Sequence, residues 1–179
     1  MNRNLIEACK KGDKPAQKRV FEYYLGGMLA ICKRYVKDNH DAEELLLNGF
    51  YKFFAGIDRF VYTDEKSTGA WLKKIMVNEC LMFLRKKDKF IFSTGEFPAD
   101  VVLDETVIDW LNADDLRKII DTLPDGYRIV FNMYVIEGYD HKEIGKLLGI
   151  SESTSRSQLA RARAILQKLL KENKVAYEQ

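Results

Sequence analysis

The most regular pattern of hydrophobic and polar positions lies between Gly138 and Leu170, and it predicts two helices separated by a tight turn. Gly149 directly follows the first hydrophobic stripe and is typical of a residue that ends a helix in the left-handed conformation. Ser151 can cap the next helix by accepting a backbone N–H bond. The turn is therefore about three to four residues long, as in a helix-turn-helix. The first stripe consists of Ile144, Leu147 and Leu148.

The second of these helices is predicted to have an inward face and a polar face. The inward face repeats at steps of four and three residues and consists of Ser155, Leu159, Ala162, Leu166 and Leu169. Arginine, serine and glutamine on the polar face can reach base edges or phosphates, and small residues allow close approach to the major groove. The candidate DNA-binding residues are Ser153, Thr154, Arg156, Ser157, Gln158, Ala160, Arg161 and Arg163. A solvated basic surface would explain the charge alone, but the short turn and the cap beside it favour DNA reading.

Hydrophobic positions at helical spacing also run through the N-terminal half. They predict a short amphipathic turn, then a long helix that the glycine pair at 26–27 is expected to loosen or break, and a further helix that begins at Asp41. A loop from Asp58 to Thr68 then precedes a long helix from Gly69 to Lys87. The chain is therefore predicted to be all-α, with two small helical domains joined by a flexible linker.

Composition and charge narrow the possible functions. The net charge of the 179 residues is only +2, too small to indicate a nucleic-acid partner, but its distribution is uneven. Eight basic and three acidic residues lie between Lys142 and Lys174, whereas residues 90–115 contain acids and no lysine or arginine. Such a separation is expected of a DNA-binding tail and an acidic connector.

Candidate chemistry for catalysis or metal binding is missing from the sequence. The three cysteines, Cys9, Cys32 and Cys80, are far apart, so we expect reduced core residues and no disulfide. Neither His40 nor His141 has a partner at metal-ligand spacing, and no nucleophile or phosphate-binding motif is visible. No stretch approaches the roughly 20 apolar residues of a membrane span. We therefore expect a cytoplasmic protein without enzyme activity, metal or cofactor, and without direct membrane insertion.

The C-terminal pattern also resembles a known family. The stretch LPDGYRIVFNMYVIEGYDHKEIGKLLGIS and the following TSRSQLARAR are similar to region 4 of bacterial sigma factors of the extracytoplasmic-function (ECF) group. In that family the second helix reads the −35 promoter element. Three positions depart from the commoner family pattern. Ser153 occupies a position where a glycine is frequent, Ser155 one where a valine usually packs inward, and Ala160 one where a bulkier side chain is often found. A hydroxyl bond from Ser155 to the backbone is expected to replace the apolar contact.

The stretch HDAEELLLNGFYKFFAGIDRF resembles region 2 of the same sigma factors. In that family this helix docks on the clamp helices of the polymerase β′ subunit. Carried over to this sequence, the resemblance implies polymerase-binding roles for Asp41, Glu43, Glu44, Leu45, Asn48 and Phe50. Acids in the first turn of a helix could instead only complement the helix dipole.

The following loop and WLKKIMVNECLMFLRKK resemble the family segment that contacts the −10 element and traps a flipped base. The implied −10 residues are Arg59, Phe60, Tyr62, Lys74, Asn78, Arg85 and Lys86. Aromatic loop residues could stack on an extruded base or could equally cover the local core. Trp71 is expected to pack. Val77 and Met82 stand where the family commonly has a basic and an acidic residue.

The resemblance covers almost the entire chain. It implies a region 2 domain at residues 1–88, an acidic linker at 89–111 and a region 4 domain with the helix-turn-helix at 112–179. A protein of this kind binds core RNA polymerase through the β′ clamp helices and the β flap, binds promoter DNA and promotes its melting. The family also implies an anti-sigma factor, often membrane-anchored, as an inhibitory partner.

Two alternatives remain open from the sequence. The same helix-turn-helix would serve a stand-alone regulator that binds duplex operator DNA without being a polymerase subunit. An adaptor that binds polymerase or a regulator without reading DNA is the other alternative. Tight promoter binding without polymerase favours the first, and activity that survives charge reversal at Arg156 and Arg161 favours the second.

Overall fold

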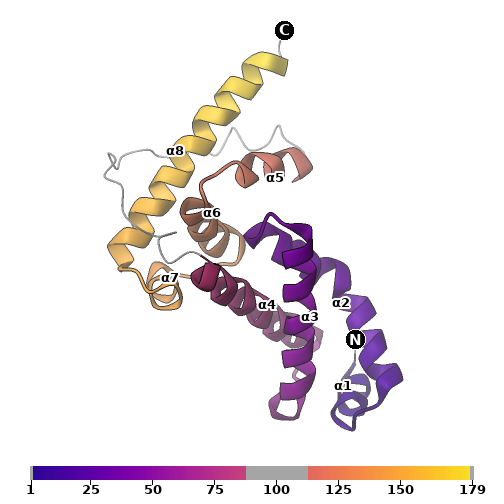
Figure 1. The fold of residues 1–179 in the computed structure, drawn as a ribbon. Helices are drawn as coiled ribbons and strands as arrows, with labels where there is room; N and C mark the ends of the chain where they lie inside the picture. The colour runs from indigo at the N-terminus through magenta and orange to yellow at the C-terminus, as the bar shows by residue number, and fades with distance from the viewer. Residues whose placement is uncertain (1, 88–112, 178–179) are drawn as a thin grey trace. The chain divides into compact units, whose positions relative to one another are not determined.

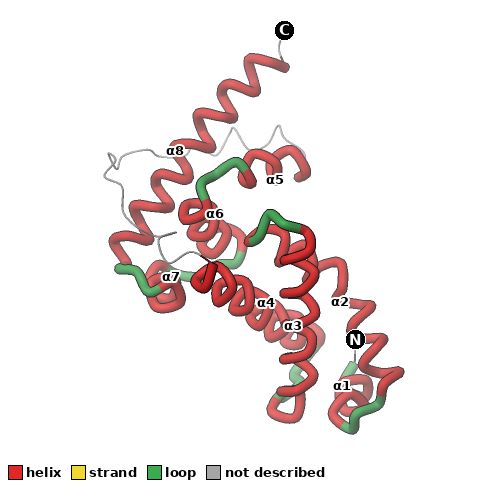
Figure 2. Tube along the Cα trace, in the orientation of Figure 1, coloured by secondary structure: helices red, strands yellow, loops and turns green. Residues whose placement is uncertain are grey.

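The computed structural model describes residues 2–87 and 113–177, and every regular element in these two ranges is a helix (Figures 1 and 2). The predicted all-α class is confirmed. The chain divides into two compact units, Met1–Lys87 and Asp88–Gln179, each with its own packing. The predicted acidic linker at 89–111 lies outside the described residues.

The first unit contains four α-helices and one short 3₁₀ helix: α1 (Arg3–Lys10), α2 (Lys14–Tyr35), α3 (Asn39–Gly56), η1 (Ile57–Arg59) and α4 (Glu65–Lys87). Side chains cap the first three of these α-helices. Asn2 accepts a hydrogen bond from the Leu5 amide at 3.0 Å, and Asp13 accepts one from the Ala16 amide at 2.9 Å. Such bonds satisfy amides that have no partner within the helix.

Two helix starts differ from those predicted. The third helix begins at Asn39, because Asp38 rather than Asp41 is the cap and accepts a hydrogen bond from the Asp41 amide at 2.9 Å. The fourth begins at Glu65, four residues before the predicted Gly69. There the Ser67 amide donates to Asp64 Oδ1 at 2.6 Å and the Asp64 amide donates to Ser67 Oγ at 3.3 Å, so a local turn extends the helix backwards.

The expected interruption of α2 does not occur, and the helix runs through Gly26 and Gly27 without a break. Both glycines are exposed and have open space where a Cβ would lie. Their propensity cost of about 1 kcal/mol each is outweighed by the buried face on either side, which includes Val20 and Ile31.

The core of the first unit lies between α2, α3 and α4, which pack pairwise, with α1 against α2 (Figure 1). Phe53, Leu72 and Met76 are fully buried there, together with the free cysteines Cys32 and Cys80. Gly49 is needed at the closest approach of α3 to α4, because a Cβ at this position would overlap Met76. The prediction that the cysteines are reduced core residues is confirmed, since Cys9 is free and buried as well.

The second unit contains α5 (Ala113–Asp121), α6 (Asp125–Phe131), a π-helical continuation η3 (Asn132–Ile136), α7 (His141–Leu148) and α8 (Glu152–Tyr177). The long α8 packs on α6 and α7. Its predicted inward face is confirmed at four positions, but Leu170 rather than Leu169 is the buried residue at the next turn. At about 100° per residue, Leu169 and Leu170 lie on opposite sides of the line through these four positions and about equally far from it, so periodicity alone does not decide which of the two is buried.

Candidate nucleic-acid and polymerase interfaces

The helix-turn-helix is built by local hydrogen bonds around α7. The Glu143 amide donates to Asp140 Oδ1 at 2.7 Å, and the Asp140 amide donates back to Glu143 Oε2 at 3.0 Å, which forms a capping box. Gly149 ends the helix with a φ of +72°, the left-handed conformation predicted for it. The Thr154 amide then donates to Ser151 Oγ at 3.0 Å, so the predicted cap of the second helix is confirmed.

Gly145 makes the turn tight. A Cβ at this position would lie 2.8 Å from the carbonyl oxygen of Ile150, which is backbone and cannot move aside cheaply. The same segment closes the turn, because the Gly149 and Ile150 amides donate to the Gly145 carbonyl at 2.9 and 3.1 Å. Only glycine fits at position 145, because the backbone that leads into α8 passes so close to α7 there.

The first turns of α8 present polar groups to solvent. Ser153 and Arg156 are exposed, and five further candidates are half-buried, namely Thr154, Ser157, Ala160, Arg161 and Arg163. Arg156 forms an ion pair with Glu152 one turn earlier. An exposed pair of this kind is worth roughly 0.2–1 kcal/mol, so the guanidinium can exchange this partner for a phosphate or a guanine edge at little cost.

Gln158 does not share this surface, which differs from the sequence prediction. Its side chain is only 3% exposed, because it lies three residues after Ser155 and four before Ala162, on the buried side of the helix. Among residues 2–87 and 113–177, its side-chain oxygen finds no hydrogen-bond partner in this buried position. We therefore remove Gln158 from the surface that can read DNA directly.

Ser155 also has a different partner from the one expected. Its hydroxyl lies 2.9 Å from Nδ1 of His141 at the start of α7, rather than bonding to the backbone. The Tyr134 ring stacks on His141 at 4.4 Å, and the Arg163 guanidinium lies 5.9 Å from the Tyr134 ring centroid. Burial, and then the nearby charge of Arg156, lower the pKa of His141, so the neutral ring is favoured. The sequence carried no signal for this cluster, because its contacts join residues 7–29 positions apart on three elements.

The −10 candidates lie on the segment between η1 and α4 and along α4 itself. Phe60 lies flat on Trp71, with ring centroids 4.8 Å apart and an interplanar angle of 4°, and Trp71 in turn contacts Phe53 at 4.9 Å. The packing expected of Trp71 is confirmed. Phe60 is half-buried, so it covers the core on one side and leaves part of its ring accessible. Arg59 is exposed and Tyr62 is half-buried.

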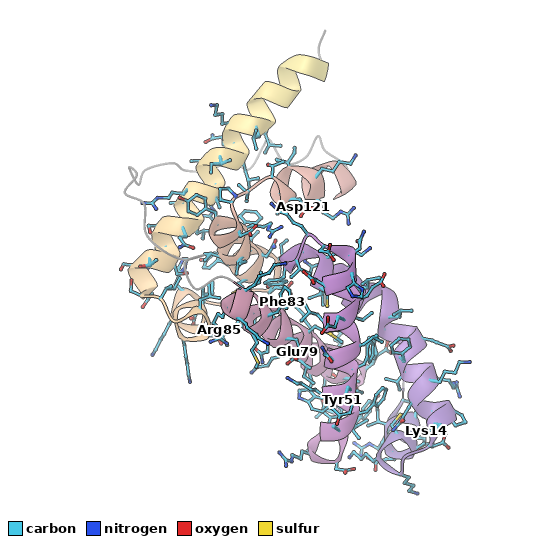
Figure 3. All side chains as sticks on the ribbon, in the orientation of Figure 1. Lys14, Tyr51, Glu79, Phe83, Arg85 and Asp121 are labelled. Atoms are coloured by element: carbon cyan, nitrogen blue, oxygen red, sulfur yellow. The ribbon has the colours of Figure 1, made fainter. Side chains whose placement is uncertain are left out.

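Three of the four candidates on α4 fall on one side of the helix. Lys74, Asn78 and Arg85 are separated by four and seven residues and therefore form a stripe about 16 Å long, at 1.5 Å per residue. Lys74 and Arg85 are exposed, and Asn78 is half-buried (Arg85 in Figure 3). Lys86, also exposed, lies about 100° around the helix from Arg85 and does not share the stripe.

Two of the polymerase-binding candidates on α3 are core residues in this structure. Leu45 is 6% and Phe50 is 3% exposed, and the Phe50 ring packs on Phe21 at 4.6 Å. Both side chains are buried on the side of α3 that packs against α2 and α4, and the accessible surface of this helix lies elsewhere. Their implied role is therefore corrected to packing.

The other side of α3 carries an exposed surface that includes the candidates Glu43, Glu44 and Asn48, and the sequence reasoning missed only its apolar member Leu47. Leu47 is 59% and Tyr51 is 74% exposed, one helical turn apart, and Glu44 and Asn48 lie beside them at the same spacing (Tyr51 in Figure 3). Three consecutive leucines, 45–47, could have been the signal, since a helix cannot bury all three on one face. We call this surface, made of Glu43, Glu44, Leu47, Asn48 and Tyr51, the α3 outer face.

Asp41 sits at the edge of this surface and is engaged within the unit. Its carboxylate accepts a hydrogen bond from Lys87 Nζ at 3.0 Å, which joins the start of α3 to the end of α4. A second pair, Lys52 with Glu79 at 2.7 Å, joins the same two helices further along. These two contacts therefore join α3 and α4 at both ends of their shared, buried interface.

Residues 2–87 and 113–177 form neither a metal site nor a membrane span. Within these ranges no three histidine, cysteine or acidic side chains come together as a metal site would require. None of the helices there is both long and apolar enough to cross a bilayer.

Comparison with known proteins agrees with the two units. The family model for sigma-70 region 2 matches residues 20–90, and the model for sigma-70 region 4 matches residues 113–166. The ECF RNA polymerase sigma factor SigW of Bacillus subtilis is 28% identical over 96% of this chain and 98% of its own length. The ECF sigma factor SigM of Mycobacterium tuberculosis (strain Erdman) is 26% identical over 94% of this chain and 84% of its own.

Two solved structures share the fold. One is the sigma factor RpoE of Bartonella quintana in complex with the anti-sigma factor NepR, with a TM-score of 0.53 at 22% identity over 86% of this chain and 96% of the other. The other is CnrH in complex with the cytosolic domain of CnrY, with a TM-score of 0.51 at 19% identity over 95% and 97%. Because two region models together match most of the sequence, and the relatives that span nearly its full length are ECF sigma factors, the chain belongs to the ECF group of the sigma-70 family.

Proposed function

We propose that this chain binds core RNA polymerase through its first unit and directs it to promoters whose −10 and −35 elements it reads with α4 and α8. The chain is a sigma factor by family, and the residue-level division of labour is the proposal. One observation carries it: a capped helix-turn-helix with an exposed polar end occurs on the same chain as a helical unit with a basic stripe and an exposed apolar face. A stand-alone regulator would not need the helical unit with its basic stripe and exposed apolar face.

The −35 element would be read by the start of α8. Arg156 and Ser153 are the most accessible candidates, with Thr154, Ser157, Ala160, Arg161 and Arg163 behind them. A bidentate contact of arginine with guanine contributes on the order of 1–3 kcal/mol of discrimination. The absence of a bulky side chain at Ala160 lets the helix lie close to the groove.

The −10 element would be engaged by the loop at Phe60–Asp64 and by the α4 stripe. The half-accessible ring of Phe60, backed by Trp71, offers a flat surface for an unstacked base. Lys74 and Arg85 would contact the backbone of the separated strand. Unstacking a base costs a few kcal/mol, so melting would be confined to sequences that open easily.

Core polymerase would bind the α3 outer face through the β′ clamp helices, while the second unit would bind the β flap. Leu47 and Tyr51 supply apolar area, and Glu43 and Glu44 supply charge around it, the composition expected of a small docking site. Two units at fixed separation on polymerase bind DNA more tightly than either alone, through effective concentration. The proposal places the protein in the cytoplasm and assigns it no catalytic step.

An anti-sigma factor is a further proposed partner. RpoE of Bartonella quintana was solved in complex with the anti-sigma factor NepR, and CnrH was solved in complex with the cytosolic domain of CnrY. Occlusion of the α3 outer face by such a protein would prevent polymerase binding.

The test is run-off transcription on a pool of genomic fragments with core polymerase, with and without this protein. New transcripts that share −35 and −10 elements are expected. Charge reversal at Arg156 and Arg161 should abolish −35-dependent transcripts, and the double change Leu47→Ala with Tyr51→Ala should weaken core binding at least tenfold, because truncation of a central aromatic contact costs about 2 kcal/mol. Lys11→Ala, which removes an exposed charge elsewhere on the first unit, is the matched control.

Three results would contradict the proposal. If core polymerase gained no promoter selectivity and the protein alone protected duplex DNA, it would be a stand-alone regulator. If the charge reversal left activity unchanged, it would be an adaptor. If the double change at Leu47 and Tyr51 left core binding intact, the α3 outer face would not be the docking site.

A further inference from the structure

The loop Phe60–Asp64 is held in place by a residue far away in the sequence. Arg3, in the first turn of α1, donates a hydrogen bond from Nη2 to the carbonyl oxygen of Tyr62 at 3.2 Å. Its guanidinium carbon also lies 5.9 Å from the centroid of the Tyr62 ring, within the range of a cation–π contact. The two residues are 59 positions apart, so α1 restrains the middle of the loop from outside.

The end of the loop is held from α2. The Tyr23 hydroxyl donates to the Glu65 carboxylate, and the Tyr24 hydroxyl donates to the Glu65 backbone carbonyl at 3.3 Å. The hydrogen bond to Glu65 raises the pKa of Tyr23, and burial raises the pKa of Tyr24 to about 12, so both hydroxyls remain protonated donors at neutral pH. Glu65 is the first residue of α4, so these bonds fix the point where the loop joins the helix.

These contacts are not required for burial of the core. Tyr23 is 58% exposed, Arg3 is exposed, and Val61 in the loop is 77% exposed. Side chains that bind an exposed loop bury little apolar area, and their main effect is to select one arrangement of that loop. A binding loop that is already ordered loses less entropy when it captures its ligand.

We propose that Arg3 and Tyr23 are positioning residues that hold the Phe60–Asp64 loop in the arrangement that captures an unstacked −10 base. This inference rests on the function proposed above and adds the role of α1 and α2 in it. Neither residue has to touch DNA. Without Arg3 and Tyr23 the loop samples other arrangements. The affinity for single-stranded −10 DNA then falls in proportion to the fraction of molecules whose loop keeps the capturing arrangement.

The experiment uses holoenzyme assembled from core polymerase and the full chain, with the purification tag at the C-terminus. The probe is a fluorescent single-stranded oligonucleotide that carries the non-template −10 sequence of a promoter found by run-off transcription. Arg3→Ala and Tyr23→Phe each remove one contact, and Lys11→Ala removes a charge from the end of the same helix without a contact to the loop. Fluorescence anisotropy gives the affinity for the probe.

Arg3→Ala is expected to weaken probe binding by about 3–10-fold and Tyr23→Phe by about 2–5-fold, as lost exposed hydrogen bonds and a lost cation–π contact predict. Arg3→Lys keeps a donor and the charge, and should recover part of the loss. Lys11→Ala should stay within about twofold of the unaltered protein, since it removes only one charge from the screened surface. Affinity for core polymerase and protection of the −35 element should be unchanged in all four variants, and the thermal midpoint should fall by no more than the lost contact accounts for, about 4–8 °C per kcal/mol.

The inference is overturned if Arg3→Ala binds the probe as tightly as Lys11→Ala does, because only general phosphate attraction would then remain. It is also overturned if Arg3→Ala and Tyr23→Phe weaken binding of core polymerase in parallel with binding of the probe, since the residues would then support the whole first unit. If the unaltered holoenzyme starts no transcript at all, the proposed function fails and takes this inference with it. Loss of probe affinity at constant affinity for core polymerase supports it.

Discussion

The two candidate DNA-binding surfaces both lie where a helix begins, but they are held in different ways. At the start of α8, the hydrogen bonds that shape the turn join residues three to five positions apart, with the His141–Ser155 contact the longest at 14. At the start of α4, three contacts span 41–59 residues and come from α1 and α2. The helix-turn-helix is therefore encoded locally, whereas the −10 loop depends on the packing of its whole unit.

This difference suggests how each surface fails. A change inside the helix-turn-helix should damage −35 reading without touching the first unit. A change in the core beneath the loop should damage −10 capture and the stability of the first unit together. The predictions below test this separation.

The largest effect is expected at Trp71, which lies beneath the loop. Trp71→Ala removes the ring that stacks on Phe60 and contacts Phe53. Since Trp71 is half-buried, the free energy of unfolding of the first unit should fall by about 2–3 kcal/mol, the lower end for aromatic truncations. Hydrogen exchange followed by mass spectrometry reports the two units separately.

The matched control for this change is Trp71→Phe, which keeps an aromatic ring under Phe60 and should lose less than half as much. Peptides from α7 and α8 should keep their protection in both variants. If those peptides lost protection to the same degree as the first unit, the separation between the two surfaces would be wrong.

An intermediate effect is expected at Gly145, which lies in the helix-turn-helix of the second unit. Gly145→Ala forces a Cβ against the Ile150 carbonyl and should destabilise the second unit by about 1–3 kcal/mol, the usual cost of overpacking. Protection of the −35 element by holoenzyme should fall, while binding of the single-stranded −10 probe should stay unchanged.

Gly27→Ala is the control for Gly145→Ala. Gly27 is exposed in the middle of α2 with open space where its Cβ would lie, so the same substitution should stabilise the first unit by about 0.4–1 kcal/mol. The opposite sign of two identical substitutions would show that packing, not glycine content, sets the cost. A stabilising Gly145→Ala would mean that the turn is looser than the structure indicates.

The helix-turn-helix was easier to predict from the sequence than the loop, because its contacts are local and those of the loop are long-range. The caps, the left-handed Gly149 and the inward stripe of α8 were predictable because each depends on neighbours in the sequence. Gln158 was misplaced because a polar residue at a buried helical position is an exception to patterning. Leu45 and Phe50 were assigned to a partner through the family resemblance, although their spacing puts them on the packed side of α3.

The loop was the least predictable element. Its boundaries moved because Asp64 and Ser67 form a local turn that extends α4 to Glu65. Arg3 and Tyr23 carry no motif, and only the packing of α1 and α2 brings them to the loop. Contacts of high sequence separation are set by tertiary structure, which periodicity does not encode.

The smallest expected effect is a pH dependence confined to the second unit. The lowered pKa of His141 means that the folded unit binds a proton less readily than the unfolded chain, whose histidine titrates near 6.5. Stability is therefore full above about pH 6.5 and falls as the pH drops below it, because protonation then favours the unfolded chain. The charged groups nearest the ring are Arg156, Arg163, Glu152 and Asp140. The arginines favour the neutral ring and the acids oppose them.

Unfolding free energies at pH 5.5 and 7.5, measured by hydrogen exchange in α7 and α8, should differ in the unaltered protein and differ less in His141→Asn. His40→Asn changes the exposed histidine of the first unit and should leave the difference in α7 and α8 intact. An unchanged difference in His141→Asn would show that another group titrates, and the Ser155 contact would then be only a packing contact.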